Sequence, residues 1–156
     1  MDTRKFLKLN DIESFRVSFH LSNYVWEVVL KWSNFSQRTV GEQFVRAVDS
    51  ISANIAEGFG RYGKKDKIKF YRYSQGSLSG SLNWNEKSKI RKLLSAEEYK
   101  FIFGELQKLP KAINALILFT NQKLKSNFHQ MITSYLLMTV FQKNQNLLQF
   151  FIRQLC

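Results

Sequence analysis

Apolar residues recur at three- and four-residue spacing in four long stretches of the chain, which is the period of helices that bury one face. The stripe is clearest in the second stretch, where it consists of Phe44, Val48, Ile51 and Ile55. The chain holds one proline and seven glycines in 156 residues, so few positions interrupt these helices. The pattern therefore predicts an all-α protein, an antiparallel up-and-down four-helix bundle.

Two capping boxes indicate where helices begin. Thr39 stands three residues before Glu42 and an apolar run, so each side chain can bond the backbone amide of the other residue. Ser95 and Glu98 repeat this spacing at the start of the fourth stretch. Residues 34–38 lack an apolar period and predict a turn before the second helix. The expected helices cover residues 12–33, 39–58, 64–92 and 95–125.

Four glycines lie at positions that need a reason. Gly58 and Gly60 are expected to end the second helix in the left-handed conformation that glycine adopts readily. Gly76 and Gly80 lie inside the third expected helix, where each costs about 1 kcal/mol relative to alanine. We therefore expect another backbone to pack closely against them.

The apolar stripes also predict which residues form the core. In the first helix these are Phe15, Phe19, Val25 or Trp26, Val29 and Trp32. In the third they are Ile68, Tyr71, Leu78, Leu82 and Ile90, and in the fourth they include Ile102, Leu106, Leu109 and Ile113. Phenylalanine is abundant, with 14 residues, so we expect some aromatic surface to face a second subunit.

The two ends of the chain differ from the bundle. Residues 1–11 are polar and charged and predict a frayed N-terminal arm, whereas residues 126–156 contain no acidic residue. This C-terminal segment is either a fifth helix or a poorly ordered extension. No signal peptide or spanning helix is apparent, and the lone cysteine, Cys156, suits a reducing compartment. We expect a cytoplasmic protein without a membrane partner.

Basic residues dominate the charge, with 24 lysines and arginines against 12 acidic residues and a formal net charge of +12. Such a balance favours anionic partners. The densest stretch contains Arg61, Lys64, Lys65, Lys67, Lys69 and Arg72, and it is interleaved with Tyr62, Phe70, Tyr71 and Tyr73. This mixture suits phosphate contacts and base stacking, and the alternative is a solvated basic face with tyrosines packed inward. The charge of the whole chain favours anion binding. Lys87, Lys89, Arg91 and Lys92 form a second basic cluster.

The sequence contains no pattern of residues that is typical of a catalytic site. Residues 58–63 match the dinucleotide-binding glycine motif and residues 58–64 nearly match a P-loop. Both motifs follow a strand, whereas a helix is expected here. His20 and His129 have no ligand-like neighbours, so we expect no metal, no cofactor and no enzymatic activity. Asn54 and Glu57 are candidates for a site, but we favour a structural role in which they bond a neighbouring helix or cap the turn after Gly58.

Three segments carry a resemblance to a known family. They are residues 50–61 (Ser-Ile-Ser-Ala-Asn-Ile-Ala-Glu-Gly-Phe-Gly-Arg), Gly76-Ser77-Leu78 and Leu109-Pro110. In this order, within residues 12–125, they resemble the bacterial four helix bundle family that includes the 23S ribosomal RNA intervening-sequence proteins. The resemblance implies a small helical bundle that assembles into homopentamers, with Asn54, Glu57, Gly58, Gly60 and Gly76 as motif positions. One branch of the family is the basic accessory partner of a retroelement reverse transcriptase.

These observations lead to a functional hypothesis with one rival. We expect an oligomeric, non-catalytic module that binds RNA or DNA through backbone phosphates, with the six basic residues of positions 61–72 as its contacts. The rival is a protein-interaction scaffold or accessory subunit whose positive charge serves an acidic protein, such as a reverse transcriptase.

Overall fold

The computed structural model describes residues 7–122, and within them the chain is helical with no strand. The chain divides after Thr120 into two units, of which the first contains the bundle. Its elements are η1 (Leu9–Asp11), α1 (Glu13–Val29), α2 (Asn34–Ser36), η2 (Gln37–Gly41), α3 (Glu42–Gly60) and α4 (Lys64–Ile90). A final helix begins at residue 96 and continues to 122, the last described position. Of the predicted arm, residues 1–11, positions 9–11 form η1 and positions 1–6 lie outside the described residues, as does the predicted C-terminal segment, residues 126–156.

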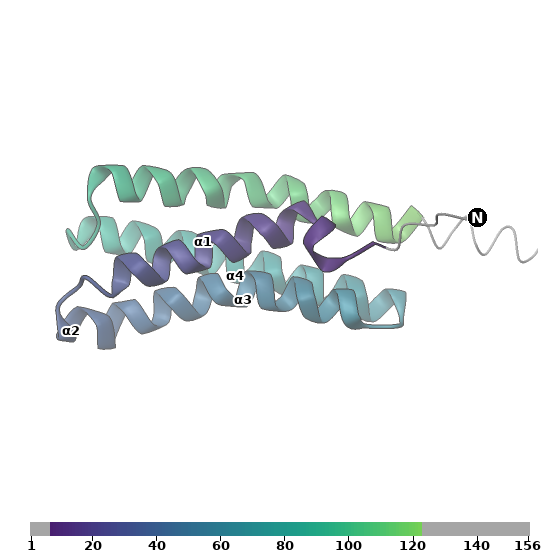
Figure 1. Cartoon of the computed structure of the whole chain (residues 1–156), viewed down its shortest axis with the longest axis horizontal. Coiled ribbons are helices and arrows are strands. Elements are labelled where there is room, and N and C mark those ends of the chain that lie inside the picture. The colour runs from purple at the N-terminus through teal and green to yellow at the C-terminus, as the bar shows by residue number, and fades with distance from the viewer. Residues whose placement is uncertain (1–6, 123–156) are drawn as a thin grey trace, which may run out of the picture. The chain divides into compact units, whose positions relative to one another are not determined.

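The four long helices lie side by side and alternate in direction, as Figure 1 shows. The ring of Tyr24 near the end of α1 lies 4.4 Å from that of Phe101 near the start of the final helix. In α4, the Gln75 amide donates to the Asn114 Oδ1 atom of the final helix at 2.7 Å. The antiparallel four-helix bundle predicted from the sequence is confirmed.

Two helices bury the residues that their sequence stripes predicted. Phe44, Val48, Ile51 and Ile55 of α3 are fully buried, and so are Ile102, Leu106, Leu109 and Ile113 of the final helix. These eight side chains belong to one core cluster, which α1 and α4 complete. Burial of one large apolar side chain contributes about 1.5 to 3 kcal/mol, so these two helices supply much of the hydrophobic stabilisation.

The first helix presents a different face to the core than the aromatic residues suggested. Phe19 and Trp26 are about half exposed, whereas Leu21, Val25 and Val28 are buried. Small polar side chains fill the remaining core-facing positions, which are Ser14, Ser18 and Ser22. The prediction for Phe19 is wrong, and of the alternatives Val25 and Trp26 it is Val25 that lies in the core.

The second long helix also begins earlier than predicted. The Ser33 hydroxyl accepts a hydrogen bond from the Ser36 amide at 3.3 Å and caps α2, which continues through η2 into α3. The segment η2 is a π-helix, and Thr39 lies within it, with its hydroxyl bonded to the Phe35 carbonyl. The expected turn at 34–38 and the capping box at Thr39 are therefore wrong.

The predicted start of the final helix is confirmed. The Ser95 amide donates to Glu98 Oε2 at 2.9 Å, and the Glu98 amide donates to Ser95 Oγ at 3.1 Å. This reciprocal pair satisfies two backbone donors that would have no partner at a helix start.

Gly58 is explained by packing and not by a left-handed helix end. No described glycine has a positive φ, and α3 continues through Gly58 to Gly60 before Arg61 adopts an extended conformation. A Cβ atom on Gly58 would lie 2.6 Å from Cε1 of Tyr71 and 3.0 Å from the Lys67 carbonyl oxygen. The glycine therefore lets α4 cross α3 closely. A Cβ on Gly60 would meet no atom within 4 Å.

The third long helix buries an unusually polar stripe. Its core-facing residues recur at three- and four-residue spacing and are Tyr71, Ser74, Leu78, Ser81, Asn85 and Ser88. Of the residues predicted to lie in its core, Ile90 is 77% exposed. Gly76 has room for a side chain and Gly80 would only touch the Ala47 Cβ at 4.0 Å, so the close backbone packing expected there is absent from the described chain.

Candidate nucleic-acid interface

The densest basic stretch lies where α3 turns into α4. The elbow, residues 61–63, joins the two helices through three residues, with Gly63 as the N-cap of α4. The Arg61 amide donates to the Gly58 carbonyl at 3.3 Å, and the Lys67 amide donates to the Gly63 carbonyl at 3.0 Å. These bonds tie both sides of the elbow to helix ends and fix the direction in which α4 leaves.

Two of the six predicted cations are used inside the molecule. Lys67 Nζ donates to the Phe59 carbonyl at 2.8 Å, near the carboxyl end of α3, where backbone oxygens lack helical partners. Arg61 forms an ion pair with Glu57 one turn earlier and lies 4.8 Å above the Phe70 ring. Both residues therefore stabilise the elbow, and their charge is partly engaged.

Three other cations form a surface that points outward. Lys65, Lys69 and Arg72 are exposed and follow one another at four- and three-residue spacing, which places them on one side of α4. That side is opposite the stripe of Tyr71 and Leu78 that packs against the core. We call Lys65, Lys69 and Arg72 the outer basic face. Lys64, the sixth predicted cation, opens α4 and is partly buried.

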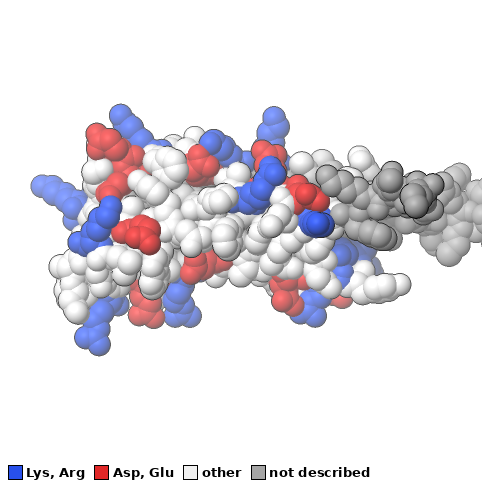
Figure 2. All heavy atoms as spheres, viewed as in Figure 1, with Lys and Arg blue, Asp and Glu red and all other residues white. Residues whose placement is uncertain are grey.

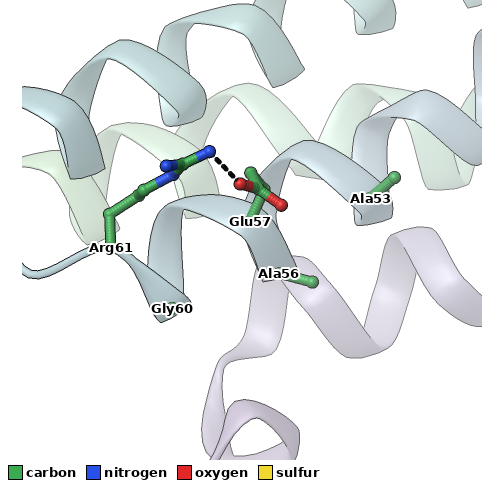
Figure 3. Close-up of a pocket in the computed structure, with 5 residues that line it drawn as sticks. All are labelled: Ala53, Ala56, Glu57, Gly60 and Arg61. Atoms are coloured by element: carbon green, nitrogen blue, oxygen red, sulfur yellow. Dashed lines mark hydrogen bonds and ion pairs between the residues drawn. The ribbon is translucent and has the colours of Figure 1, made fainter.

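A shallow hollow lies beside the elbow on α3. It has a volume of about 480 Å³ and is lined by Ala53, Ala56, Glu57, Gly60 and Arg61. Figure 3 shows the Arg61 side chain turned back toward Glu57 along one side of the small residues.

Asn54 lies deeper along α3. Its amide nitrogen donates to the Ser50 carbonyl at 2.7 Å and reaches Ser77 Oγ of α4 at 3.5 Å. Asn54 thus contacts the neighbouring helix, and Glu57 contacts the elbow, while Gly76 lies exposed on α4.

The opposite end of α4 carries the second basic cluster. Lys87 lies 4.5 Å above the Trp84 ring, and Lys89 lies 4.0 Å above the Tyr99 ring. The Tyr99 hydroxyl donates to Glu86, and this bond raises the pKa of Tyr99 because it favours the protonated phenol. Arg91 and Lys92 are exposed.

Charge is distributed unevenly between the helices. Positions 61–92 contain ten basic residues and two acidic ones. On the face seen in Figure 2, where α1 lies in front, acidic and basic side chains are interspersed. The excess of positive charge therefore belongs mainly to α4 and its two ends.

Sequence reasoning missed an apolar groove between α1 and the start of α3. It has a volume of about 440 Å³, and Trp26 and Leu30 on its wall are each 51% exposed. A Cβ on Gly41 would lie 2.5 Å from Val29 Cγ1, so a glycine is needed where the helices approach there. Its lining residues are Trp26, Val29, Leu30, Gln37, Arg38, Gly41, Glu42, Val45 and Arg46. The signal was a second stripe, Phe19, Trp26 and Leu30, at seven- and four-residue spacing.

The described part of the chain contains neither a metal-binding cluster nor a membrane-spanning helix. Residues 7–122 contain no group of three or more His, Cys, Asp or Glu side chains that could hold a metal ion, and His20 is exposed. The helices of this part are all too short or too polar to cross a membrane. His129 and Cys156 lie outside the described residues.

The fold and the elbow define a small antiparallel four-helix-bundle protein in which α4 and the residues at its two ends carry most of the net positive charge. The model of the 23S rRNA-intervening sequence protein family matches residues 10–115, and the chain belongs to this family, as the segments from residue 50 to Pro110 predicted. No curated protein sequence matches the chain.

A solved structure with a similar fold comes from Bacteroides thetaiotaomicron. It is a protein of unknown function from the S23 ribosomal protein family, with a TM-score of 0.59 and 17% sequence identity. The match covers 67% of this chain and 97% of that one. At this identity the similarity concerns the fold.

Proposed function

We propose that this protein is a non-catalytic module that binds RNA or DNA through backbone phosphates, and that it acts in the cytoplasm. The observation that supports the proposal is the outer basic face, where Lys65, Lys69 and Arg72 are exposed on one side of α4. An RNA partner also agrees with the family description, which refers to an intervening sequence of 23S rRNA. No cofactor or metal has a part in this role.

The contacts would be electrostatic and independent of base sequence. A lysine or arginine that neutralises a phosphate releases a condensed counterion, so the affinity falls as the salt concentration rises. Each such contact contributes about 0.7 to 0.9 to the slope of log K against log salt. The second cluster at Arg91 and Lys92 lies at the other end of α4, where it can extend the contact along one nucleic acid.

The test measures oligonucleotide binding over a salt series. The variant Lys65→Glu, Lys69→Glu, Arg72→Glu should bind much more weakly than the natural protein, with a salt slope shallower by about 2 to 3 because three phosphate contacts are lost. Fluorescence anisotropy with a labelled RNA and a labelled DNA of the same sequence gives both quantities.

A matched control reverses the same number of charges elsewhere. Arg16 on α1 and Lys100 and Lys111 on the final helix are exposed, and their reversal changes the net charge equally. We expect this control to keep most of the affinity and the salt slope. Equal losses in both triple variants, or an affinity that does not depend on salt, would contradict the proposal.

We also propose that the protein self-associates through the apolar groove. The exposed Trp26 and Leu30 give this surface its apolar character, and the family resemblance implies a homopentamer. The variant Trp26→Glu would place a charge in the contact and should reduce the sedimentation coefficient, whereas Phe35→Glu changes a 77% exposed residue outside the groove and serves as the control. Sedimentation of the natural protein as a monomer at all concentrations would refute the proposal.

An acidic protein partner is the second candidate function, and the same groove favours it. Arg38 and Arg46 line the groove beside the apolar wall, and Arg46 lies 3.7 Å from Glu42. This arrangement fits an apolar segment with an acidic residue opposite Arg38, such as one on a reverse transcriptase. Affinity purification with and without nuclease separates the two candidates. A protein partner that persists after digestion supports the scaffold, and loss of all partners supports nucleic-acid binding.

A further inference from the structure

Tyr62 lies in the elbow and is the most exposed large hydrophobic side chain among residues 7–122. Its relative exposure is 104%, so its ring has no protein contact to cover it. The residue stands between Arg61, which is held by Glu57, and Gly63, which caps α4. An aromatic ring that stays fully in water gains nothing from hydrophobic burial in this fold.

The neighbouring aromatic residues are already engaged within the bundle. Tyr71 is 2% exposed in the core, and the Phe70 ring has the Arg61 guanidinium on it and the Tyr73 ring at its edge, 5.7 Å away. Tyr73 also has the Lys69 ammonium 5.8 Å from its centroid. Tyr73 is 49% exposed, so of the four aromatic residues in the basic stretch Tyr62 is the one whose side chain is exposed completely.

The backbone on either side of Tyr62 is fixed. The elbow contains three residues between two long helices, and the bonds from the Arg61 amide and to the Gly63 carbonyl hold both of its ends. The backbone of such a short connection loses little conformational freedom when a ligand stacks on the ring, because folding has already ordered it, and only the side-chain rotamer of Tyr62 remains to be fixed. The exposed Lys65 is the second residue of α4 and follows Tyr62 by three positions in the chain, so the outer basic face begins next to the elbow.

From these observations we propose that Tyr62 stacks on an unpaired base of a single-stranded nucleic acid whose phosphates lie on the outer basic face. The proposal rests on the nucleic-acid-binding function and specifies its ligand. A base inside a duplex presents only its edges, whereas an unpaired base offers the flat surface that an aromatic ring can cover. RNA and DNA single strands share this chemistry.

The experiment compares ligands that have the same phosphates but different bases. The probes are a 16-nucleotide single-stranded RNA, the DNA of the same sequence, a blunt duplex of that DNA, and an abasic deoxyribose-phosphate oligomer of equal length. The full chain and its variants Tyr62→Ala, Tyr62→Phe and Tyr73→Ala are titrated against each probe. Circular dichroism checks that each variant keeps its helices.

For Tyr62→Ala we expect affinity for the single-stranded RNA or DNA to fall by about 5- to 150-fold, the loss found for one base-stacking aromatic residue. Affinity for the abasic oligomer and for the duplex should change less than about 2-fold, because their contacts are to phosphates. Tyr62→Phe keeps the ring and should retain the affinity. Tyr73→Ala removes a ring that is 49% exposed and contacts Lys69 and Phe70, so its effect should be smaller than that of Tyr62→Ala.

The outcomes separate this proposal from the function on which it rests. If Tyr62→Ala binds the single strands normally while reversal of the outer basic face abolishes binding, stacking by Tyr62 is refuted and phosphate binding stands. If Tyr62→Ala lowers the affinity for the abasic oligomer as much as the affinity for the base-bearing strands, the residue does not recognise bases and the proposal is again refuted. If the natural protein binds none of the probes, both proposals are refuted.

Discussion

Replacement of Gly58 by alanine tests whether the close crossing of α3 and α4 determines the residue at this position. Two effects oppose each other. Alanine in a helix is favoured over glycine by about 1 kcal/mol. Against this, the new Cβ would lie 2.6 and 2.9 Å from two carbons of the Tyr71 ring and 3.0 Å from a backbone oxygen.

The steric effect should exceed the gain in helix propensity. The ring of Tyr71 is 2% exposed and cannot rotate away into solvent, and the Lys67 carbonyl belongs to the α4 backbone. Overpacking of this kind costs typically about 1 to 3 kcal/mol, and contacts with a buried ring and a backbone atom favour the upper part of that range. We expect a net loss of about 1 to 2 kcal/mol, which lowers the Tm by about 3 to 6 °C for a chain of this size.

Thermal and urea unfolding followed by circular dichroism measure this change, and Gly76→Ala is the matched control. Gly76 also lies inside a helix, but a Cβ there would meet no atom within 4 Å. The free energy of unfolding of Gly76→Ala should therefore rise by about 1 kcal/mol. The two alanine variants are thus expected to change stability in opposite directions. If Gly58→Ala is as stable as the natural protein, or more stable, the packing argument is wrong.

Two further predictions concern buried polar groups of α4. Burial raises the pKa of Tyr71 above its usual value of 10, although a hydrogen bond with Thr120 opposes this. The folded state therefore holds the phenol proton more strongly than the unfolded state. The free energy of unfolding should fall as the pH rises above 10. Urea unfolding of Tyr71→Phe should show a weaker alkaline loss, and an unchanged one would disprove the linkage. Asn85 is fully buried, and its amide nitrogen and oxygen have no hydrogen-bond partner among residues 7–122, so Asn85→Leu should raise the free energy of unfolding by about 1 to 3 kcal/mol in the same assay. A loss of stability in that variant would show that the amide is satisfied in solution.

The sequence predicted the core residues correctly in those helices that have a single apolar stripe. In α3 and the final helix, large aliphatic residues recur on a single face, and Ile51 and Leu106 are fully buried as expected. In α1 an outward stripe that contains Phe19 and Trp26 competes with the buried aliphatic residues, so periodicity places Phe19 in the core and leaves Val25 and Trp26 as alternatives. Serines in the core of α1 and α4 carry no apolar signal, so periodicity could not identify those faces.

Two local features, the π-helical segment η2 and the packing of Gly58, could not be predicted from the sequence, for different physical reasons. The π-helical segment η2 inserts extra residues into a turn of the helix, which breaks the 3.6-residue period that would have revealed a helix from Asn34 onward. Gly58 was assigned to a left-handed helix end because its distant neighbour Tyr71 cannot be identified from local sequence.

The candidate site was only partly foreseeable. The sequence located all six cations within residues 61–72, but their separation into groups depends on tertiary contacts. Lys67 reaches a carbonyl eight residues earlier, and Arg61 pairs with Glu57. Lys65, Lys69 and Arg72 remain exposed on one side of α4.

The polar stripe of α4 has a consequence for the internal motions of the bundle. Ser74 and Ser81 bond carbonyls of their own helix and bury little apolar area, so release of α4 from the bundle exposes less hydrophobic surface than release of α3. Partial opening should therefore begin with α4, which is also the helix that presents cations to solvent. A bound polyanion that requires α4 to be folded would suppress this opening, and amide hydrogen exchange would then slow most in α4.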